Sequence, residues 1–113
     1  MIRLLVIDDD YFDIMAFKRF FKNIDTIELE TVQSISDAID KIKKSTFDIL
    51  ISDFNLKDGN AFELLEVKGN IPIVIITGVD SNQIALEDLK VGAYDFIVKD
   101  SKGDYIKTLP IVI

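Results

Sequence analysis

The 113-residue chain contains no cysteine and no histidine. Without cysteine it can form neither a disulfide framework nor a thiolate metal site. Without histidine it lacks imidazole for acid–base catalysis and cannot carry a phosphohistidine of its own. Any chemistry that this chain performs must therefore depend on carboxylates, hydroxyls and amines.

Long apolar runs and excess positive charge are absent as well. No run approaches the roughly 20 residues that a membrane-spanning helix needs, and three aspartates interrupt the first apolar stretch after Ile7. The chain has 13 basic and 20 acidic residues, a formal net charge of −7. Such a charge repels phosphates at long range and argues against direct nucleic-acid binding. We expect a cytoplasmic protein with no membrane contact.

Hydrophobic residues make up 49% of the sequence and charged residues 29%, which is the balance of an ordinary globular domain. A chain of this length can bury one compact core but not two. It has no internal repeat, low-complexity stretch or linker. We therefore predict a single domain over residues 1–113.

Five short segments have the pattern of β-strands. Residues 4–7, 49–51 and 71–76 are apolar almost throughout, which predicts strands buried on both faces. Residues 94–98 are similar but include Asp95. Residues 26–31 alternate between apolar and acidic side chains, which predicts a strand at the edge of the sheet.

In the segments between these strands, apolar residues recur at the spacing typical of helices. The predicted helices span residues 11–23, 34–44, 61–68 and 81–91, and a last one begins near residue 104. In the first helix we expect several large side chains to pack on the sheet: Phe12, Met15, Phe17, Phe20 and Phe21. Asp10 is expected to cap the first helix and Ser34, with Asp37, the second. Asp58-Gly59 predicts only a turn.

Strict alternation of strands and helices predicts an α/β fold: a doubly wound, five-stranded parallel sheet with helices on both faces. The strands end in polar residues: Asp8-Asp9-Asp10, Asp53, Thr77 and Lys99. Ligands bind in such folds beyond the carboxyl ends of the strands. We therefore expect these side chains to gather at one edge of the sheet.

The gathered side chains suit phosphoryl chemistry with a divalent cation. Two carboxylates about 4 Å apart repel by roughly 4 kcal/mol in a partly exposed site, and Mg²⁺ with its preference for oxygen ligands removes that cost. Lys99 offers a positive charge to an incoming phosphoryl group and Thr77 a hydroxyl donor. Asp53 is then the candidate nucleophile, since aspartyl phosphate is an established type of covalent intermediate.

The sequence resembles the receiver domain of two-component response regulators over essentially the whole chain. The matching motifs are Asp8-Asp9, Ile-Ser-Asp-Phe-Asn-Leu around Asp53, Ile-Thr-Gly at residues 76–78, and Phe-Ile-Val-Lys at residues 96–99. Any one of them alone is weak, but all four occur in order. The resemblance implies the flavodoxin-like strand order 2-1-3-4-5.

The resemblance also implies roles. Asp53 accepts a phosphoryl group from a histidine kinase or phosphotransfer protein. Mg²⁺ is held by the Asp9 and Asp53 side chains and the Asn55 backbone carbonyl, and Asp8 orients a metal-bound water. Thr77 and Lys99 bind the phosphate oxygens, and Phe96 occupies the switch position that responds to Thr77. Such a domain is a phosphoacceptor that assists its own phosphorylation and dephosphorylation, rather than an enzyme.

The implied partners include a fused or separate output domain and a homodimer through the face of the fourth helix, fifth strand and fifth helix. Lys99 is followed by Asp100 where the family usually has proline, which resembles receivers that open multidomain proteins. The chain ends on Ile111-Val112-Ile113 without a helix stop signal. This ending is consistent with two interpretations of similar weight: a natural protein that continues beyond Ile113, and a hydrophobic tail that frays.

Three other functions share features with this sequence. A pseudo-receiver, which serves only as a protein-interaction module, is the main alternative, but such proteins usually lose an acidic residue or the lysine. A phosphatase with an aspartate nucleophile typically has a second aspartate where Asn55 stands. A flavodoxin-type flavin carrier needs a phosphate-binding loop after the first strand, where this chain has three aspartates.

Overall fold

The computed structural model describes residues 1–77, 95–98 and 106. The helices in these residues are α1 (Tyr11–Phe21), α2 (Ile35–Lys44) and α3 (Phe62–Val67). The strands are β1 (Ile2–Ile7), β2 (Ile27–Val32), β3 (Ile49–Asp53), β4 (Asn55–Leu56), β5 (Gly59–Asn60), β6 (Ile73–Thr77) and β7 (Asp95–Val98). The helix predicted over residues 81–91 lies outside the described residues, as does the one predicted from residue 104 apart from Ile106. Of the predicted dimer face, the described residues therefore include only β7 and Ile106.

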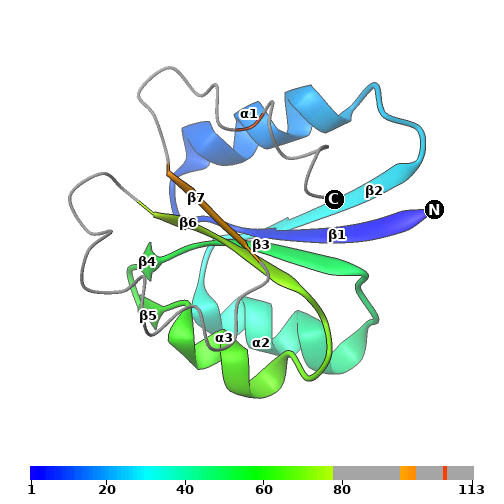
Figure 1. Ribbon diagram of the computed structural model, residues 1–113. Coiled ribbons are helices and arrows are strands. Elements are labelled where there is room, and N and C mark those ends of the chain that lie inside the picture. Colours follow the sequence, from blue (N-terminus) through cyan, green and yellow to red (C-terminus); the bar gives the residue numbers. More distant parts are fainter. Residues whose placement is uncertain (78–94, 99–105, 107–113) are drawn as a thin grey trace.

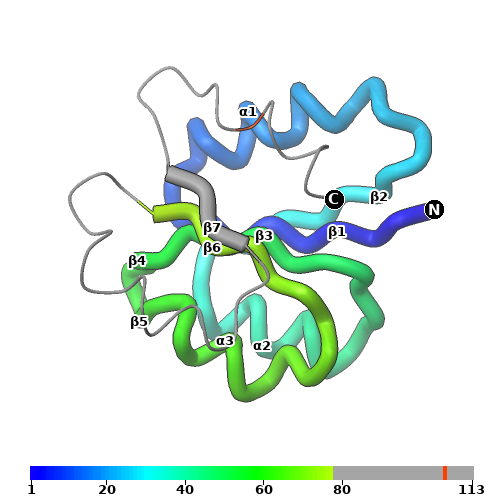
Figure 2. The backbone as a smooth tube through the Cα atoms, viewed as in Figure 1, coloured from blue at the N-terminus to red at the C-terminus, as the bar shows by residue number. Residues whose placement is uncertain are grey.

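Five strands form one parallel sheet in the order β2-β1-β3-β6-β7. These five are the predicted strands, and numbered in chain order they confirm the doubly wound arrangement 2-1-3-4-5. In Figures 1 and 2, α1 lies on one face of the sheet and α2 and α3 lie on the other. The predicted edge strand, β2, has no fully buried residue, as its alternating sequence indicated.

The pleat of the strands divides the core into two layers. Leu4 and Val6 of β1 pack with Phe17 and Phe21 of α1, and Ile106 joins this layer. Leu5 and Ile7 face the opposite side and pack with residues of α2 and α3. Apolar residues therefore follow one another along β1, because both faces of the central strands are covered.

The buried face of α1 differs from the predicted one. Ile14, Phe17 and Phe21 are buried, a spacing of three and four residues that keeps one face toward the sheet. Phe12 and Met15 fall on the outer side of the helix and are 82% and 37% exposed. The expectation that Phe12 and Met15 pack on the sheet is therefore wrong, since the helical period allows only one of the two apolar stripes to face it.

Both predicted N-caps are confirmed. The Asp10 carboxylate accepts a hydrogen bond from the N–H of Phe12 at 2.9 Å, and the Ser34 hydroxyl accepts one from the N–H of Asp37 at 3.0 Å. Each bond satisfies a donor that the helix itself cannot pair. Among the helices of the described residues, none is both long and apolar enough to cross a membrane.

Candidate functional site

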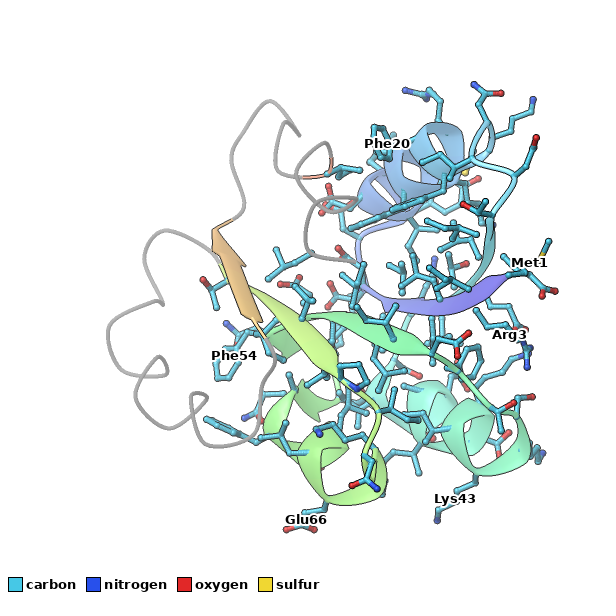
Figure 3. All side chains as sticks on the ribbon, turned by 45° about the vertical axis from the view of Figure 1, so that its right-hand side comes forward. Met1, Arg3, Phe20, Lys43, Phe54 and Glu66 are labelled. Carbon is cyan, nitrogen blue, oxygen red and sulfur yellow. The ribbon has the colours of Figure 1, made fainter. Side chains whose placement is uncertain are left out.

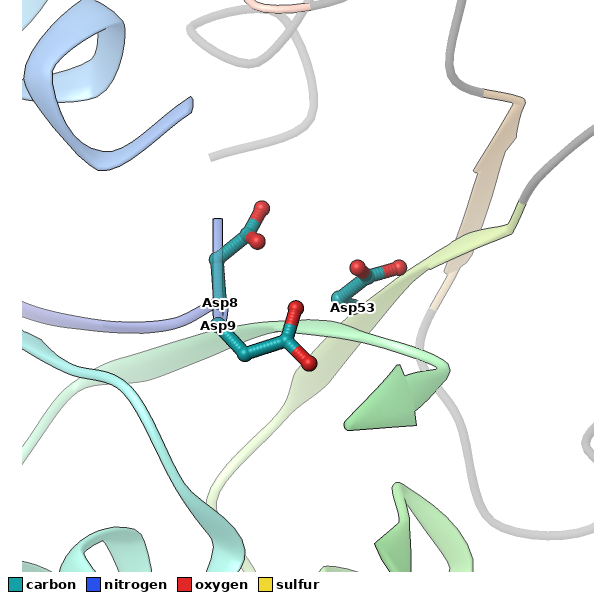
Figure 4. Close-up of side chains that lie close together, drawn as sticks. All are labelled: Asp8, Asp9 and Asp53. Atoms are coloured by element: carbon teal, nitrogen blue, oxygen red, sulfur yellow. The ribbon is translucent and has the colours of Figure 1, made fainter. Parts of the chain in front are cut away.

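Three carboxylates meet just beyond the carboxyl ends of β1 and β3. Asp8 and Asp9 directly follow β1, and Asp53 is the last residue of β3. One carboxylate oxygen from each lies within 4.8 Å of those of the other two, and Figure 4 shows the side chains gathered around the same space. Because β1 and β3 are parallel neighbours, their ends bring together residues that are 44 positions apart, from Asp9 to Asp53.

The three carboxylates differ in exposure and local support. Asp8 is buried, with 1% of its surface exposed, and its Oδ1 accepts a hydrogen bond from the N–H of Asp10 at 2.9 Å. Asp9 and Asp53 are half-buried. The Asp8 side chain is therefore fixed by the turn into α1, while the other two carboxylates remain accessible from solvent.

This cluster has the donor chemistry of a hard-cation site. At 4.8 Å, two carboxylates repel by roughly 3 kcal/mol at the effective dielectric of a partly exposed site. A divalent cation with oxygen ligands offsets such repulsion, and Mg²⁺ commonly binds one or two carboxylates together with waters. The residues present therefore fit the predicted Mg²⁺.

The Thr77 hydroxyl, at the end of β6, is buried, and its Oγ1 has no hydrogen-bond partner within the described part of the chain. Register places Asp53 opposite Ile76, one residue before Thr77. Burying a hydroxyl without a hydrogen bond costs free energy, and most buried polar groups in folded proteins therefore have a partner. Thr77 is thus a donor that a ligand at this edge of the sheet could use.

The remaining predicted site residues are placed only in part. Asn55 lies two residues beyond Asp53, in β4. Phe96 lies in β7, where its backbone is opposite Ile75. Lys99 lies outside the described residues. The structure thus brings together Asp8, Asp9 and Asp53 as predicted, and their roles remain predictions.

Comparison with known proteins agrees with this geometry. The family model described as "Response regulator receiver domain" matches residues 4–109, nearly the whole chain. The chain belongs to this family.

Individual relatives are similar to this receiver domain at low identity. It is 27% identical over 113 residues to the two-component response regulator ARR2 of Arabidopsis thaliana, an alignment that covers 96% of this chain and 17% of ARR2. It is 28% identical to the sensory transduction protein LytT of Bacillus anthracis, covering 88% of this chain and 42% of LytT. The chain therefore spans less than half the length of either relative.

A solved structure matches it from end to end. The chemotaxis response regulator CheY4 of Vibrio cholerae superimposes with a TM-score of 0.83 at 27% identity, covering 100% of this chain and 99% of the CheY4 chain. The similarity supports the same flavodoxin-like arrangement that the strand order shows.

Charge is arranged differently at the two ends of the receiver sheet. Arg3, near the amino end of β1, forms an ion pair with Glu30 at 2.8 Å, and Lys41 of α2 pairs with the same carboxylate at 3.0 Å. Figure 3 shows Arg3 and Phe54 at opposite ends of the sheet. Two cations thus bind the Glu30 carboxylate, and a separate group of three carboxylates, Asp8, Asp9 and Asp53, gathers at the carboxyl end of the sheet, close in sequence to Phe54.

Sequence reasoning missed the role of Asp58. It was predicted to form only a turn, and it does lie in the turn between β4 and β5. Its Oδ1 also accepts a hydrogen bond from the N–H of Ile35 at 2.9 Å, and its Oδ2 accepts one from the N–H of Ser36 at 3.0 Å. The sequence could not reveal this contact because 22 and 23 residues separate the partners.

The hydrogen bond from the Ile35 backbone, followed by that from Ser36, lowers the pKa of Asp58 below its ordinary value. A carboxyl group with a depressed folded-state pKa stabilises the fold fully above its unfolded pKa of about 3.9, and the contribution disappears as the pH falls through the folded value. We therefore expect wild type to have a higher urea midpoint of unfolding than Asp58→Asn at pH 6. The difference between the two midpoints should shrink progressively below about pH 4. A difference that grows on acidification would contradict this assignment.

Proposed function

We propose that this receiver domain accepts a phosphoryl group on Asp53 from a histidine kinase or phosphotransfer protein, in a Mg²⁺-dependent reaction. The phosphorylated domain changes conformation and so controls a fused or separate output domain or partner. The observation that carries the proposal is the meeting of Asp8, Asp9 and Asp53 at the carboxyl edge of the sheet, with ligand oxygens within 4.8 Å of one another.

The residues that would hold Mg²⁺ are Asp9 and Asp53 through their side chains and Asn55 through its backbone carbonyl, with Asp8 orienting a metal-bound water. When bound, the cation neutralises carboxylate and phosphate oxygens, so that an anionic nucleophile can approach an anionic donor. The buried Asp8, held by the Asp10 N–H, keeps its position without depending on the ligand.

Asp53 supplies the nucleophile. One of its carboxylate oxygens forms a bond to phosphorus while the phosphorus–nitrogen bond of the donor phosphohistidine breaks. The electron pair of that bond returns to the imidazole nitrogen, which takes a proton, and Asp53 becomes an acyl phosphate. Its position at the end of β3, half-buried but reachable, suits a group that must meet the side chain of another protein.

Two further residues would bind the new phosphate. The Thr77 hydroxyl, buried and without a partner among the described residues, gains an acceptor when a phosphoryl oxygen arrives. Lys99 supplies the compensating positive charge. Movement of Thr77 toward the phosphate would change the space available to Phe96, and the ligand shifts this equilibrium only by its differential affinity for the two conformations.

The test is covalent labelling with acetyl phosphate and Mg²⁺, followed by intact-mass measurement. We expect one phosphoryl adduct on wild type and none on Asp53→Asn, because an amide oxygen is a poor nucleophile. Excess EDTA should abolish the adduct.

Asp25→Asn, which changes an exposed carboxylate in the loop before β2, is the control and should be labelled normally. Equal labelling of Asp53→Asn would refute the assignment, and a folded wild type that is never labelled would favour the pseudo-receiver alternative.

A further inference from the structure

The hairpin that follows the acceptor is too small to fix its own position. It consists of two residue pairs, Asn55 with Asn60 and Leu56 with Gly59, and a short isolated hairpin is marginal in water. Tight two-residue turns favour positive φ angles, but no non-glycine residue of the described chain has one. The position of β4 and β5 therefore depends on contacts with the rest of the domain.

Asp58 makes such a contact. Its two carboxylate oxygens accept from the N–H groups of Ile35 and Ser36, the first two residues of α2. These N–H groups have no partner within the helix, and a carboxylate also suits the positive end of the helix dipole. The turn of the hairpin is thereby joined to the start of α2.

The other end of the hairpin is joined to α3 by local bonds. The Asn60 side chain accepts from the N–H of Phe62 at 3.0 Å, and the Glu63 carboxylate accepts from the N–H of Asn60 at 3.2 Å. Gly59 has a φ of +156°, and a Cβ there would collide with the Glu63 carboxylate. Among the hydrogen bonds of the described residues, those of Asp58 are the ones that connect the hairpin to α2.

We propose that Asp58 is a positioning residue for the phosphoacceptor site, and that Mg²⁺ binding is coupled through Asp58 to the first turn of α2. This inference rests on the proposed function, because Asn55, whose carbonyl is assigned to the metal, lies in β4 of the same hairpin. A hairpin held by α2 keeps that carbonyl in place, and a bound cation in turn holds the hairpin against α2. Coupling of this kind must act equally in both directions.

The first measurement is the Mg²⁺ dissociation constant of three proteins by calorimetry. Asp58→Ala should bind Mg²⁺ about tenfold more weakly than wild type, at the low end of the range for residues that orient metal ligands. Asp40→Ala removes one carboxylate from an exposed position of the same helix, where it pairs with Lys44 at 3.1 Å, and it leaves the hairpin and the first two amides of α2 untouched. It should change the affinity by no more than about twofold, as expected for an independent site.

The second measurement is hydrogen exchange at the first amides of α2. In wild type, saturating Mg²⁺ should slow hydrogen exchange at the Ile35 and Ser36 amides by about the same tenfold factor, since the coupling is reciprocal. The Asp37 amide, bonded to Ser34, should change less. In Asp58→Ala the Ile35 and Ser36 amides should exchange rapidly with or without the ligand.

The outcomes separate this inference from the proposed function. If wild type binds Mg²⁺ and Asp58→Ala binds it equally well, Asp58 is not a positioning residue. The same conclusion follows if the hydrogen-exchange rates of the Ile35 and Ser36 amides do not change when the ligand binds. If wild type neither binds Mg²⁺ nor gains a phosphoryl adduct, the proposed function itself fails. Should Asp58→Ala not fold, Asp58→Asn, which retains one acceptor oxygen, should show an intermediate loss of affinity, and an affinity equal to that of wild type would overturn the inference.

Discussion

Replacing Asp9 with alanine is expected to raise the melting temperature of the metal-free receiver domain and to remove most of its stabilisation by Mg²⁺. One oxygen of Asp9 lies within 4.8 Å of an oxygen of both Asp8 and Asp53. Each such pair repels by roughly 3 kcal/mol at an effective dielectric of 20. Asp9 is half-exposed to water, so we expect the substitution to stabilise the metal-free protein by only about 1 kcal/mol.

With Mg²⁺ the order of stability should reverse. At a concentration one hundred times its dissociation constant, a ligand that binds only the folded state stabilises it by about 2.7 kcal/mol. Asp9→Ala removes a carboxylate ligand and should lose most of this gain. Thermal unfolding with EDTA and with Mg²⁺ measures both effects in one series.

Asp25→Ala is the matched control for the Asp9 experiment. It removes one negative charge from the loop between α1 and β2, away from the carboxyl edge of the sheet. It should leave the Mg²⁺-induced rise in melting temperature unchanged. An equal rise in Asp9→Ala would show that Asp9 is not a metal ligand.

The sequence predicted the sheet well because the central strands are buried on both faces. Leu4 to Ile7 and Ile49 to Ile51 appear as continuous apolar runs, and such runs reveal a doubly covered parallel sheet. The starts of two strands were less accurate, since β1 begins at Ile2 and β6 at Ile73. β3 ends at Asp53 as predicted; Ser52 within it, although polar, is fully buried and donates its hydroxyl to the Asp53 carbonyl at 2.8 Å.

The acidic cluster was predictable for a topological reason. Once β1 and β3 are neighbouring parallel strands, residues that directly follow their apolar runs must meet at one edge. This reasoning places Asp8, Asp9 and Asp53 without any knowledge of side-chain contacts. It says nothing about the loop that follows Asp53, whose course depends on distant partners.

The β4–β5 hairpin was missed for that reason. Its two residue pairs carry no hydrophobic periodicity. Its position depends on the hydrogen bonds that Asp58 accepts from α2 and on Leu56, which is buried in one core cluster with residues of α2 and α3. The missed exposure of Phe12 has another cause. Phe12 was predicted to pack on the sheet because the large apolar residues of the helix lie at mixed three- and four-residue spacings, whereas the buried face consists of Ile14, Phe17 and Phe21.

Thr77→Val is expected to stabilise the receiver domain while impairing its phosphorylation. The substitution preserves the branched shape of the side chain and removes Oγ1, which is buried without a partner within the described residues. Removing a buried hydroxyl that has no hydrogen bond should raise the free energy of unfolding by about 1–2 kcal/mol.

The same substitution removes a hydrogen-bond donor to the phosphoryl oxygens. Since a hydrogen bond to a charged group contributes about 1.5–3 kcal/mol, labelling by acetyl phosphate should slow by at least about tenfold.

Thr77→Ser provides the opposite combination. It keeps the hydroxyl and deletes one buried methyl group, so stability should fall by about 1 kcal/mol while labelling continues near the wild-type rate. Urea unfolding and the initial rate of adduct formation, measured on wild type and both variants, therefore separate packing from hydrogen bonding. If Thr77→Val were labelled as fast as wild type, the hydroxyl would have no part in binding the phosphoryl group. If it were also less stable than wild type, Oγ1 would have to find a partner in the folded domain.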